Sequence, residues 1–247
     1  MTSHQRDHAR TMRLTGEDLA AMIDVSAVQS FNTEQDVREL AETAARVGFI
    51  MAHALPHYVP LLRSLLPRGG RTMVGAPVGF PSGGHTTATK LAEARDLIRS
   101  GADELDLMMN IGRLKSGDLA YVQDEASAVV EAAAPVPVKV IIEAGRLTDD
   151  EIRRACDIVV RSGAAFVKTG TGWLSTPTTF AQVALIADTV RGAVQIKASG
   201  GIRDLDTVTR MIALGVTRFG ISTQAAVALV DRCAAVAGGV RVNAGGR

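Results

Sequence analysis

The sequence is poor in aromatic residues and in cysteine, and it has no excess of charge of either sign. Aromatic residues make up 4% of the 247 residues, with a single tryptophan, which leaves little for a surface that stacks on nucleic-acid bases. Lys and Arg number 27 against 26 Asp and Glu, so no broad basic surface is available for nucleic acid or anionic lipid. We therefore expect neither nucleic acid nor a membrane as a partner.

Disulfides, membrane-spanning segments and a secretory signal are not expected either. Cys156 and Cys233 are too few for a disulfide framework, and we expect both to be buried and inert. The longest uncharged apolar-looking run, residues 47–62, is interrupted by prolines and histidines and is shorter than the roughly 20 residues of a membrane helix. Residues 1–8 lack the apolar core of a secretory signal. Together these absences predict a cytoplasmic enzyme of small metabolites.

Short β-rich runs alternate with helical runs along the whole chain. The helical runs, such as Thr33 to Val47 and Asp149 to Ser162, carry apolar residues at helical spacing. Eight runs are predicted as strands: Met22 to Val28, Phe49 to Ala54, Thr72 to Val78, Glu104 to Asn110, Val138 to Ala144, Phe166 to Gly170, Gln195 to Gly200 and Arg218 to Thr223.

Eight β/α units in about 250 residues are typical of a (β/α)8 barrel. A doubly wound sheet would more often show a Gly-x-Gly-x-x-Gly turn after its first strand, and the sequence has none there. We therefore predict an α/β protein whose residues 1–247 form a single (β/α)8 barrel domain, with loosely ordered ends at about 1–13 and 238–247.

Four ionisable residues interrupt successive strands that are otherwise apolar. Side chains alternate across a strand, so Asp106 faces the barrel interior when Leu105 and Leu107 face the helices. The same alternation turns Lys139, Lys168 and Lys197 inward. Burying an unpaired charge costs several kcal/mol, so one carboxylate with three amines is difficult to explain as packing alone.

This arrangement predicts amine chemistry. Neighbouring strands lie about 4.8 Å apart, so Lys168 and Lys197 should approach each other closely. Repulsion and burial lower a lysine pKa and supply the neutral amine that a Schiff base requires. Asp106 could then carry protons to and from the intermediates. The alternative is a buried ion-pair network without chemistry, and the excess of amines argues against it.

Glycines and hydroxyls gather at the ends of the last three predicted strands. Segments Lys168 to Gly172, Ser199 to Arg203 and Gly220 to Thr223 offer backbone amides, hydroxyls and helix N-termini, which are the parts of a phosphate site. Taken singly, such glycines are more often only turn residues. The histidines show no metal-ligand spacing, so we expect no metal and no cofactor, and structural roles for His53, His57 and His85.

Five segments of the chain resemble the deoxyribose-phosphate aldolase family, class I aldolases that cleave 2-deoxyribose 5-phosphate to acetaldehyde and glyceraldehyde 3-phosphate. They are Val78 to Pro81, Gly101 to Asp106 with Asn110 to Gly117, Val138 to Glu143, Phe166 to Thr169 and Ile196 to Arg203.

The resemblance implies a Schiff base on Lys168, perturbation of its amine by Lys197 and a proton relay through Asp106. It implies a sugar phosphate and aldehydes as substrates, and a homo-oligomer, dimer or tetramer. Substrate-binding roles are implied for Asp24, Lys139, Thr171, Gly172, Gly200, Gly201, Arg203, Gly220 and Ser222.

The chain departs from the family pattern near the predicted barrel mouth. Val25 follows Asp24 where the family has Asp-His-Thr, His53 lies in the usual Cys-Val-Asn-Pro-like run, and Trp173 stands where a Phe is usual. These departures leave two alternatives open: a related lysine-dependent aldolase with another aldehyde acceptor, or a phosphate-binding barrel isomerase that forms no imine. A non-catalytic ligand-binding barrel is the least favoured.

Overall fold

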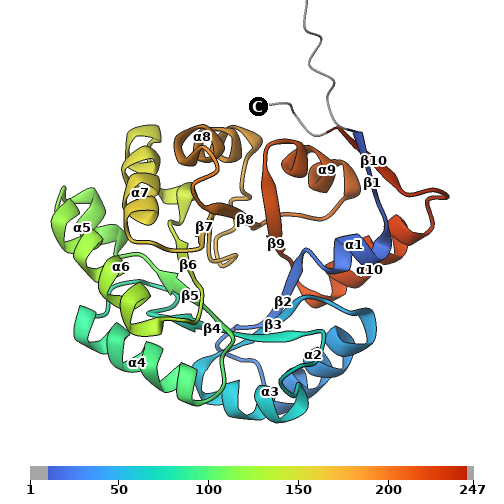
Figure 1. Ribbon diagram of the computed structural model, residues 1–247, viewed down its shortest axis with the longest axis horizontal. Helices are drawn as coiled ribbons and strands as arrows, with labels where there is room; N and C mark the ends of the chain where they lie inside the picture. Colours follow the sequence, from blue (N-terminus) through green and yellow to red (C-terminus); the bar gives the residue numbers. More distant parts are fainter. Residues whose placement is uncertain (1–10, 244–247) are drawn as a thin grey trace, which may run out of the picture.

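The computed structural model describes residues 11–243, and its centre is a closed barrel of eight parallel strands (Figure 1). The strands follow one another around the barrel in chain order, and the last pairs with the first. They are β2 (Ile23–Ala27), β3 (Met51–Ala54), β4 (Met73–Val78), β5 (Glu104–Met108), β6 (Val138–Ile141), β7 (Phe166–Lys168), β8 (Gln195–Ser199) and β9 (Val216–Gly220). The predicted (β/α)8 barrel is confirmed, although several strands end a few residues earlier than predicted, where the chain turns into loops.

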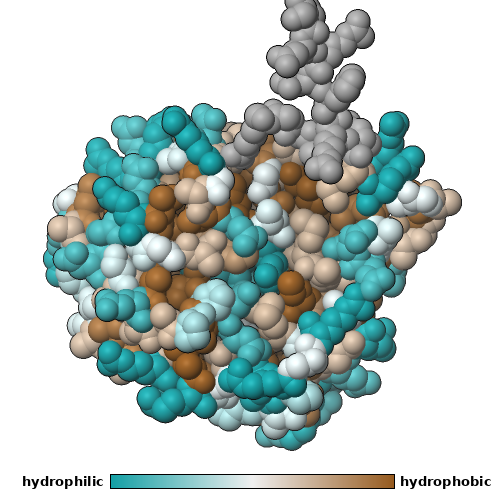
Figure 2. Space-filling model, in the orientation of Figure 1, coloured by the Kyte–Doolittle hydropathy of each residue, from teal (hydrophilic) through white to brown (hydrophobic). Residues whose placement is uncertain are grey.

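Helices form a ring around the barrel (Figure 1). None between residues 11 and 243 is both long and apolar enough to cross a membrane. The helices are α1 (Gly16–Ala20), α2 (Glu34–Val47), α3 (Val59–Leu65), α4 (Thr87–Arg99), α5 (Ile111–Lys115), α6 (Leu119–Ala133), α7 (Asp149–Arg161), α8 (Phe180–Val190), α9 (Leu205–Ala213) and α10 (Thr223–Ala234), with short 3-10 turns at Pro56–Tyr58 and Ala144–Arg146. Figure 2 shows hydrophilic residues around the outside of the molecule in this view, with hydrophobic residues more frequent toward the middle.

Most of the apolar core lies between the strands and the helices, because the outward-facing strand residues are aliphatic. Leu105 and Leu107 are buried there, as the alternation predicted, and so are Val25, Val140 and Val167. The inward-facing positions of the same strands instead carry charged residues such as Asp24, Lys139 and Lys168. The barrel wall therefore separates an apolar layer outside from a polar interior.

The two ends of the described chain pair with each other. Strand β1 (Thr11–Leu14) runs antiparallel to β10 (Val240–Asn243), and Leu14 pairs with Val240. The prediction of loose order is wrong for residues 11–13 and 240–243, because each segment supplies the backbone partners of the other across the length of the chain. Of the remaining predicted loose residues, Gly238 and Gly239 lie in the turn before β10, and residues 1–10 and 244–247 lie outside the described range.

Packing of β10 can be tested with a pair of adjacent substitutions. Val242 is fully buried, whereas Arg241 beside it is exposed. We expect Val242→Asn to lower the free energy of unfolding by about 3 kcal/mol, through lost apolar contacts and a buried amide. Arg241→Asn should change it by less than about 0.5 kcal/mol. Urea unfolding measures both, and equal effects would contradict the described packing.

Candidate active site

A cavity of about 330 Å³ opens at the carboxyl ends of the barrel strands, the end at which active sites of this fold occur. Its size lies within the range of roughly 300–1,000 Å³ that is common for small-molecule sites. His53, Phe80 and Trp173 line it together with most of the predicted site residues, namely Asp24, Asp106, Lys168, Thr171, Gly172, Lys197, Gly200, Gly201, Arg203, Gly220 and Ser222. Six strands, β2, β3, β5, β7, β8 and β9, and loops at the same end of the barrel thus bring these residues into one cavity.

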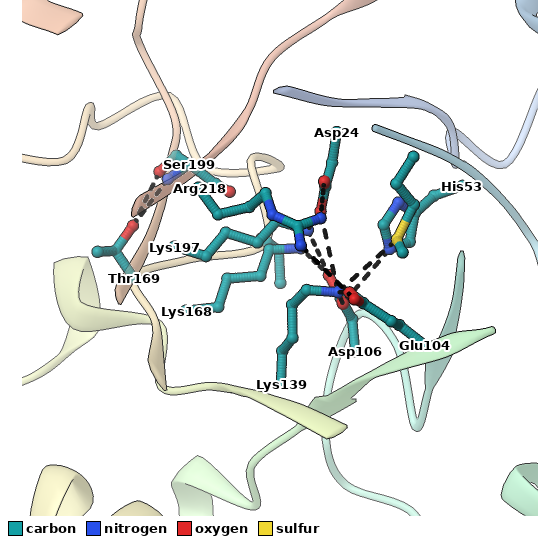
Figure 3. Close-up of polar contacts among 12 residues, drawn as sticks. Asp24, His53, Glu104, Asp106, Lys139, Lys168, Thr169, Lys197, Ser199 and Arg218 are labelled. Atoms are coloured by element: carbon teal, nitrogen blue, oxygen red, sulfur yellow. Dashed lines mark hydrogen bonds and ion pairs between the residues drawn. The ribbon is translucent and has the colours of Figure 1, made fainter. Parts of the chain in front are cut away.

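Asp106 lies at the centre of the charged residues (Figure 3). Its Oδ2 atom accepts hydrogen bonds from Lys168 Nζ and from Lys197 Nζ, both at 2.8 Å. Its Oδ1 atom lies 3.2 Å from Lys139 Nζ and 3.3 Å from His53 Nε2. Burial alone would raise the pKa of Asp106, but the surrounding lysine ammonium groups hold this pKa well below its ordinary value.

Lys139 differs from the other predicted site residues because it does not line the cavity. Its side chain is fully buried, and its Nζ forms ion pairs with Glu104 and Asp106. The substrate-binding role implied for Lys139 is therefore not supported by its position. The inward direction predicted from the strand alternation is nevertheless confirmed, because Lys139 Nζ lies 3.2 Å from Asp106 Oδ1 inside the barrel.

Two charged residues of the barrel interior, Glu104 and Arg218, were not predicted from the sequence. Glu104 contacts Lys139 and lies 3.5 Å from Arg218, which also lies 2.8 Å from Asp24. Strand alternation could have found both, because Glu104 is two residues before Asp106 on the same face of β5. Likewise, Arg218 is two residues before Gly220 on β9.

The additional residues change the charge balance of the interior. Instead of one carboxylate with three amines, the barrel holds three carboxylates and four cationic side chains: Asp24, Glu104 and Asp106 with Lys139, Lys168, Lys197 and Arg218. The expected large excess of amines is therefore wrong. Charges balance when a single amine is neutral, and an uncompensated buried charge is costly.

Lys168 is the amine best placed to be neutral. Burial, together with repulsion from Lys197, lowers the pKa of Lys168 to about 8, although Asp106 acts in the opposite direction. Lys197 contacts two carboxylates, Asp24 at 2.5 Å and Asp106 at 2.8 Å, whereas Lys168 contacts only Asp106 among the ion pairs of residues 11–243. A pKa of about 8 gives Lys168, which lines the cavity, a far larger fraction of neutral amine near pH 7 than an ordinary lysine has.

His53 contacts the same carboxylate from strand β3. Burial lowers the pKa of His53, so the imidazole is mainly neutral near pH 7. The ring fills the space over Gly75 on β4, where an added Cβ would lie 2.3 Å from His53 Nε2. A structural role was expected for this histidine, but the structure places it in the cavity wall and beside Asp106.

The opposite end of the cavity is made of glycines and helix starts. Gly200 and Gly201 have positive φ angles, and a Cβ on Gly201 would lie 2.3 Å from Pro177 Cβ. Ser222 is the N-cap residue of α10, and its hydroxyl makes no capping hydrogen bond. The Ser199 hydroxyl is buried and has no hydrogen-bond partner among the described residues. Such a surface of amides and hydroxyls at a helix N-terminus suits an anion.

Fold and site together define a (β/α)8 lyase built around a buried lysine. Residues 14–223 match the DeoC/LacD family aldolase, and the chain belongs to this family. The deoxyribose-phosphate aldolase of Sinorhizobium medicae (strain WSM419) is 66% identical over 225 residues, which cover 91% of each chain. That of Klebsiella pneumoniae (strain ATCC 700721 / MGH 78578) is 51% identical over 215 residues, 86% of each chain.

A solved structure has the same fold. The tetrameric deoxyribose phosphate aldolase from Aeropyrum pernix matches with a TM-score of 0.80 and 31% sequence identity. The match covers 88% of this chain and 91% of that chain.

The lowered pKa of Lys168 can be measured before any substrate is assigned. In reductive methylation with limiting formaldehyde and cyanoborohydride, labelling of Lys168 should rise with pH and reach half its maximum near pH 8, because only the neutral amine reacts. In protein unfolded in urea, the midpoint should move toward the ordinary lysine value of about 10.4. Peptide mass spectrometry gives both profiles, and the same midpoint in folded and unfolded protein would contradict the assignment.

Proposed function

We propose that this enzyme reversibly cleaves 2-deoxy-D-ribose 5-phosphate to acetaldehyde and D-glyceraldehyde 3-phosphate through an imine on Lys168. The observation that carries the proposal is the position of Lys168 Nζ, which lines the cavity 2.8 Å from a carboxylate that it shares with Lys197. The activity named for the relatives from Sinorhizobium medicae and Klebsiella pneumoniae supports the choice of substrate.

Imine formation starts with the neutral amine. Lys168 Nζ attacks the C1 carbonyl carbon of the open-chain sugar, and the resulting carbinolamine loses water to give a protonated imine. Asp106, with Lys197 and a water molecule, supplies and removes the protons of these steps. The 2.8 Å contacts from Asp106 Oδ2 to both amines support such proton transfer.

Bond cleavage follows from the protonated imine. Removal of the proton from the C3 hydroxyl breaks the C2–C3 bond, and the electron pair moves to the imine to form an enamine. Glyceraldehyde 3-phosphate leaves with C3 as its aldehyde carbon. Protonation of the enamine at C2 and hydrolysis of the imine then release acetaldehyde and regenerate the Lys168 amine.

The glycine-rich end of the cavity is proposed to hold the phosphate. Gly172, Gly200, Gly201, Gly220 and Ser222 line it, and Arg203 contributes a cation at its exposed edge. Contacts to this distant group would orient C1 against Lys168 and supply binding energy for the reaction.

The covalent step gives the decisive test. We expect borohydride reduction in the presence of 2-deoxyribose 5-phosphate or acetaldehyde to leave an adduct on Lys168, which peptide mass spectrometry locates. Lys168→Ala should lose the adduct and at least about 10⁴-fold of kcat, because nucleophilic catalysis is removed. Cleavage that persists in Lys168→Ala, or an isomerisation without any adduct in the folded enzyme, would contradict the proposal.

Substrate range is tested with the same assay. Cleavage of the non-phosphorylated sugar should be much weaker, because the anion site then contributes no binding energy. A preference for another aldehyde acceptor would instead favour the related lysine-dependent aldolase.

The assembly and location also belong to this proposal. We propose a homo-oligomer, and the tetrameric relative from Aeropyrum pernix supports this. Light scattering behind a sizing column should give a mass of two or four times 26.0 kDa, and a monomer at micromolar concentration would contradict it. A cytoplasmic location stays a prediction from the sequence.

A further inference from the structure

Glu143 is a buried carboxylate at the end of β6 that the mechanism does not use. It is 9% exposed and comes directly before the 3-10 turn Ala144–Arg146. Its backbone adopts φ 48° and ψ 56°, a left-handed conformation that is costly for a residue other than glycine. Such a conformation persists only where surrounding contacts fix it, and strained residues of this kind cluster at functional sites.

Both carboxylate oxygens of Glu143 bind one residue of the neighbouring loop. Thr171 donates its backbone N–H to Oε1 at 3.1 Å and its hydroxyl to Oε2 at 2.6 Å. The loop also approaches the carboxylate closely, since a Cβ on Gly170 would lie 2.7 Å from Glu143 Oε1. Thr171 is therefore held by two hydrogen bonds to a residue in the loop after β6.

The same contact continues into the cavity wall. The Thr171 hydroxyl oxygen accepts a hydrogen bond from Trp173 N at 3.1 Å, so the Thr171 side chain connects Glu143 to Trp173. Thr171, Gly172 and Trp173 all line the cavity. Trp173 in turn packs edge-on against Phe80 from the loop after β4, with ring centroids 5.5 Å apart.

We infer that Glu143 is a positioning residue that sets the place of Thr171, Gly172 and Trp173 against the phosphate of the substrate. This inference rests on the proposed function for the identity of the substrate. Glu143 contacts neither Lys168 nor Asp106 among the polar contacts of the described residues, so its effect should fall on binding of the phosphorylated end and not on imine formation. Thr171 thereby acts mainly through its bonds to Glu143.

The test separates the two ends of the substrate. We expect Glu143→Ala to raise KM for 2-deoxyribose 5-phosphate by about tenfold or more, because a misplaced binding group loses much of its contribution. Borohydride trapping of acetaldehyde, which has no phosphate, should proceed within about twofold of the unaltered rate. Glu143→Gln should keep KM close to the value of the unaltered enzyme, because its amide oxygen still accepts a hydrogen bond from Thr171.

Two further variants serve as controls. Thr171→Val should raise KM in the same way, and adding it to Glu143→Ala should have little further effect if both act through one contact. Asp103→Asn alters a carboxylate that also accepts a backbone N–H, from Val74 at 2.9 Å, but at the amino end of β5. It should leave KM within about twofold.

A binding measurement keeps this inference separate from the proposed reaction. Trp173 is the only tryptophan, so titration with inorganic phosphate can be followed by its fluorescence. Glu143→Ala should weaken phosphate binding about tenfold, and Glu143→Gln much less. Unchanged phosphate binding and KM in Glu143→Ala, or an equal loss of acetaldehyde trapping, would overturn the inference. A missing Lys168 adduct in the unaltered protein would instead overturn only the proposed function.

Discussion

The Asp106 carboxylate is the group around which the charged interior of this barrel is arranged. It is 1% exposed, and its two oxygens meet three lysines and a histidine that come from four other strands. Removing it would take away the one ion-pair partner of Lys168 among residues 11–243 and one carboxylate partner each of Lys139 and Lys197, and an uncompensated buried charge is costly. The position of Asp106 therefore fixes both the side chains around it and the protonation states that they can adopt.

The same electrostatics distinguish Lys168, the lysine proposed to form the imine, from the lysines beside it. Lys139 and Lys197 each contact two carboxylates at 3.2 Å or less, and for Lys139 the carboxylates outweigh the opposing effect of burial and raise the pKa. Lys168 shares Asp106 with both of them and extends to the cavity. The interior charges thus lower the pKa of the lysine that is proposed to react, while the apolar layer outside the strands supplies the packing.

The order of the strands and the inward lysines could be predicted because they follow from local patterns. Two-residue alternation along β5 to β8 is sufficient to turn Asp106, Lys139, Lys168 and Lys197 into one interior. That Lys139 contacts other side chains and not the cavity depends on depth along the barrel, which alternation does not give. The same alternation also turns Glu104 and Arg218 inward, although neither was predicted as an interior residue.

Other features have no local signal. The left-handed backbone conformation of Glu143 is unfavourable for a glutamate. It is accounted for by the hydrogen bonds of this side chain with Thr171 on the neighbouring loop. The contact of His53 with Asp106 depends on the missing side chain of Gly75 on an adjacent strand. The pairing of β1 with β10 joins the two ends of the chain, so neither segment alone predicts it.

That terminal pairing also bears on how the barrel is closed. Strand β2 meets β9 through only two paired positions, Ile23 with Phe219 and Asp24 with Gly220, so the first and last strands form a short seam. Strand β1 precedes β2 and β10 follows the helix after β9, so their antiparallel ribbon connects the chain on both sides of that seam. Opening the barrel between β2 and β9 would strain this ribbon, and it would also separate Asp24 on β2 from Arg218 on β9. The paired ends of the chain thus restrain separation of β2 from β9, where the fewest positions of the barrel are paired.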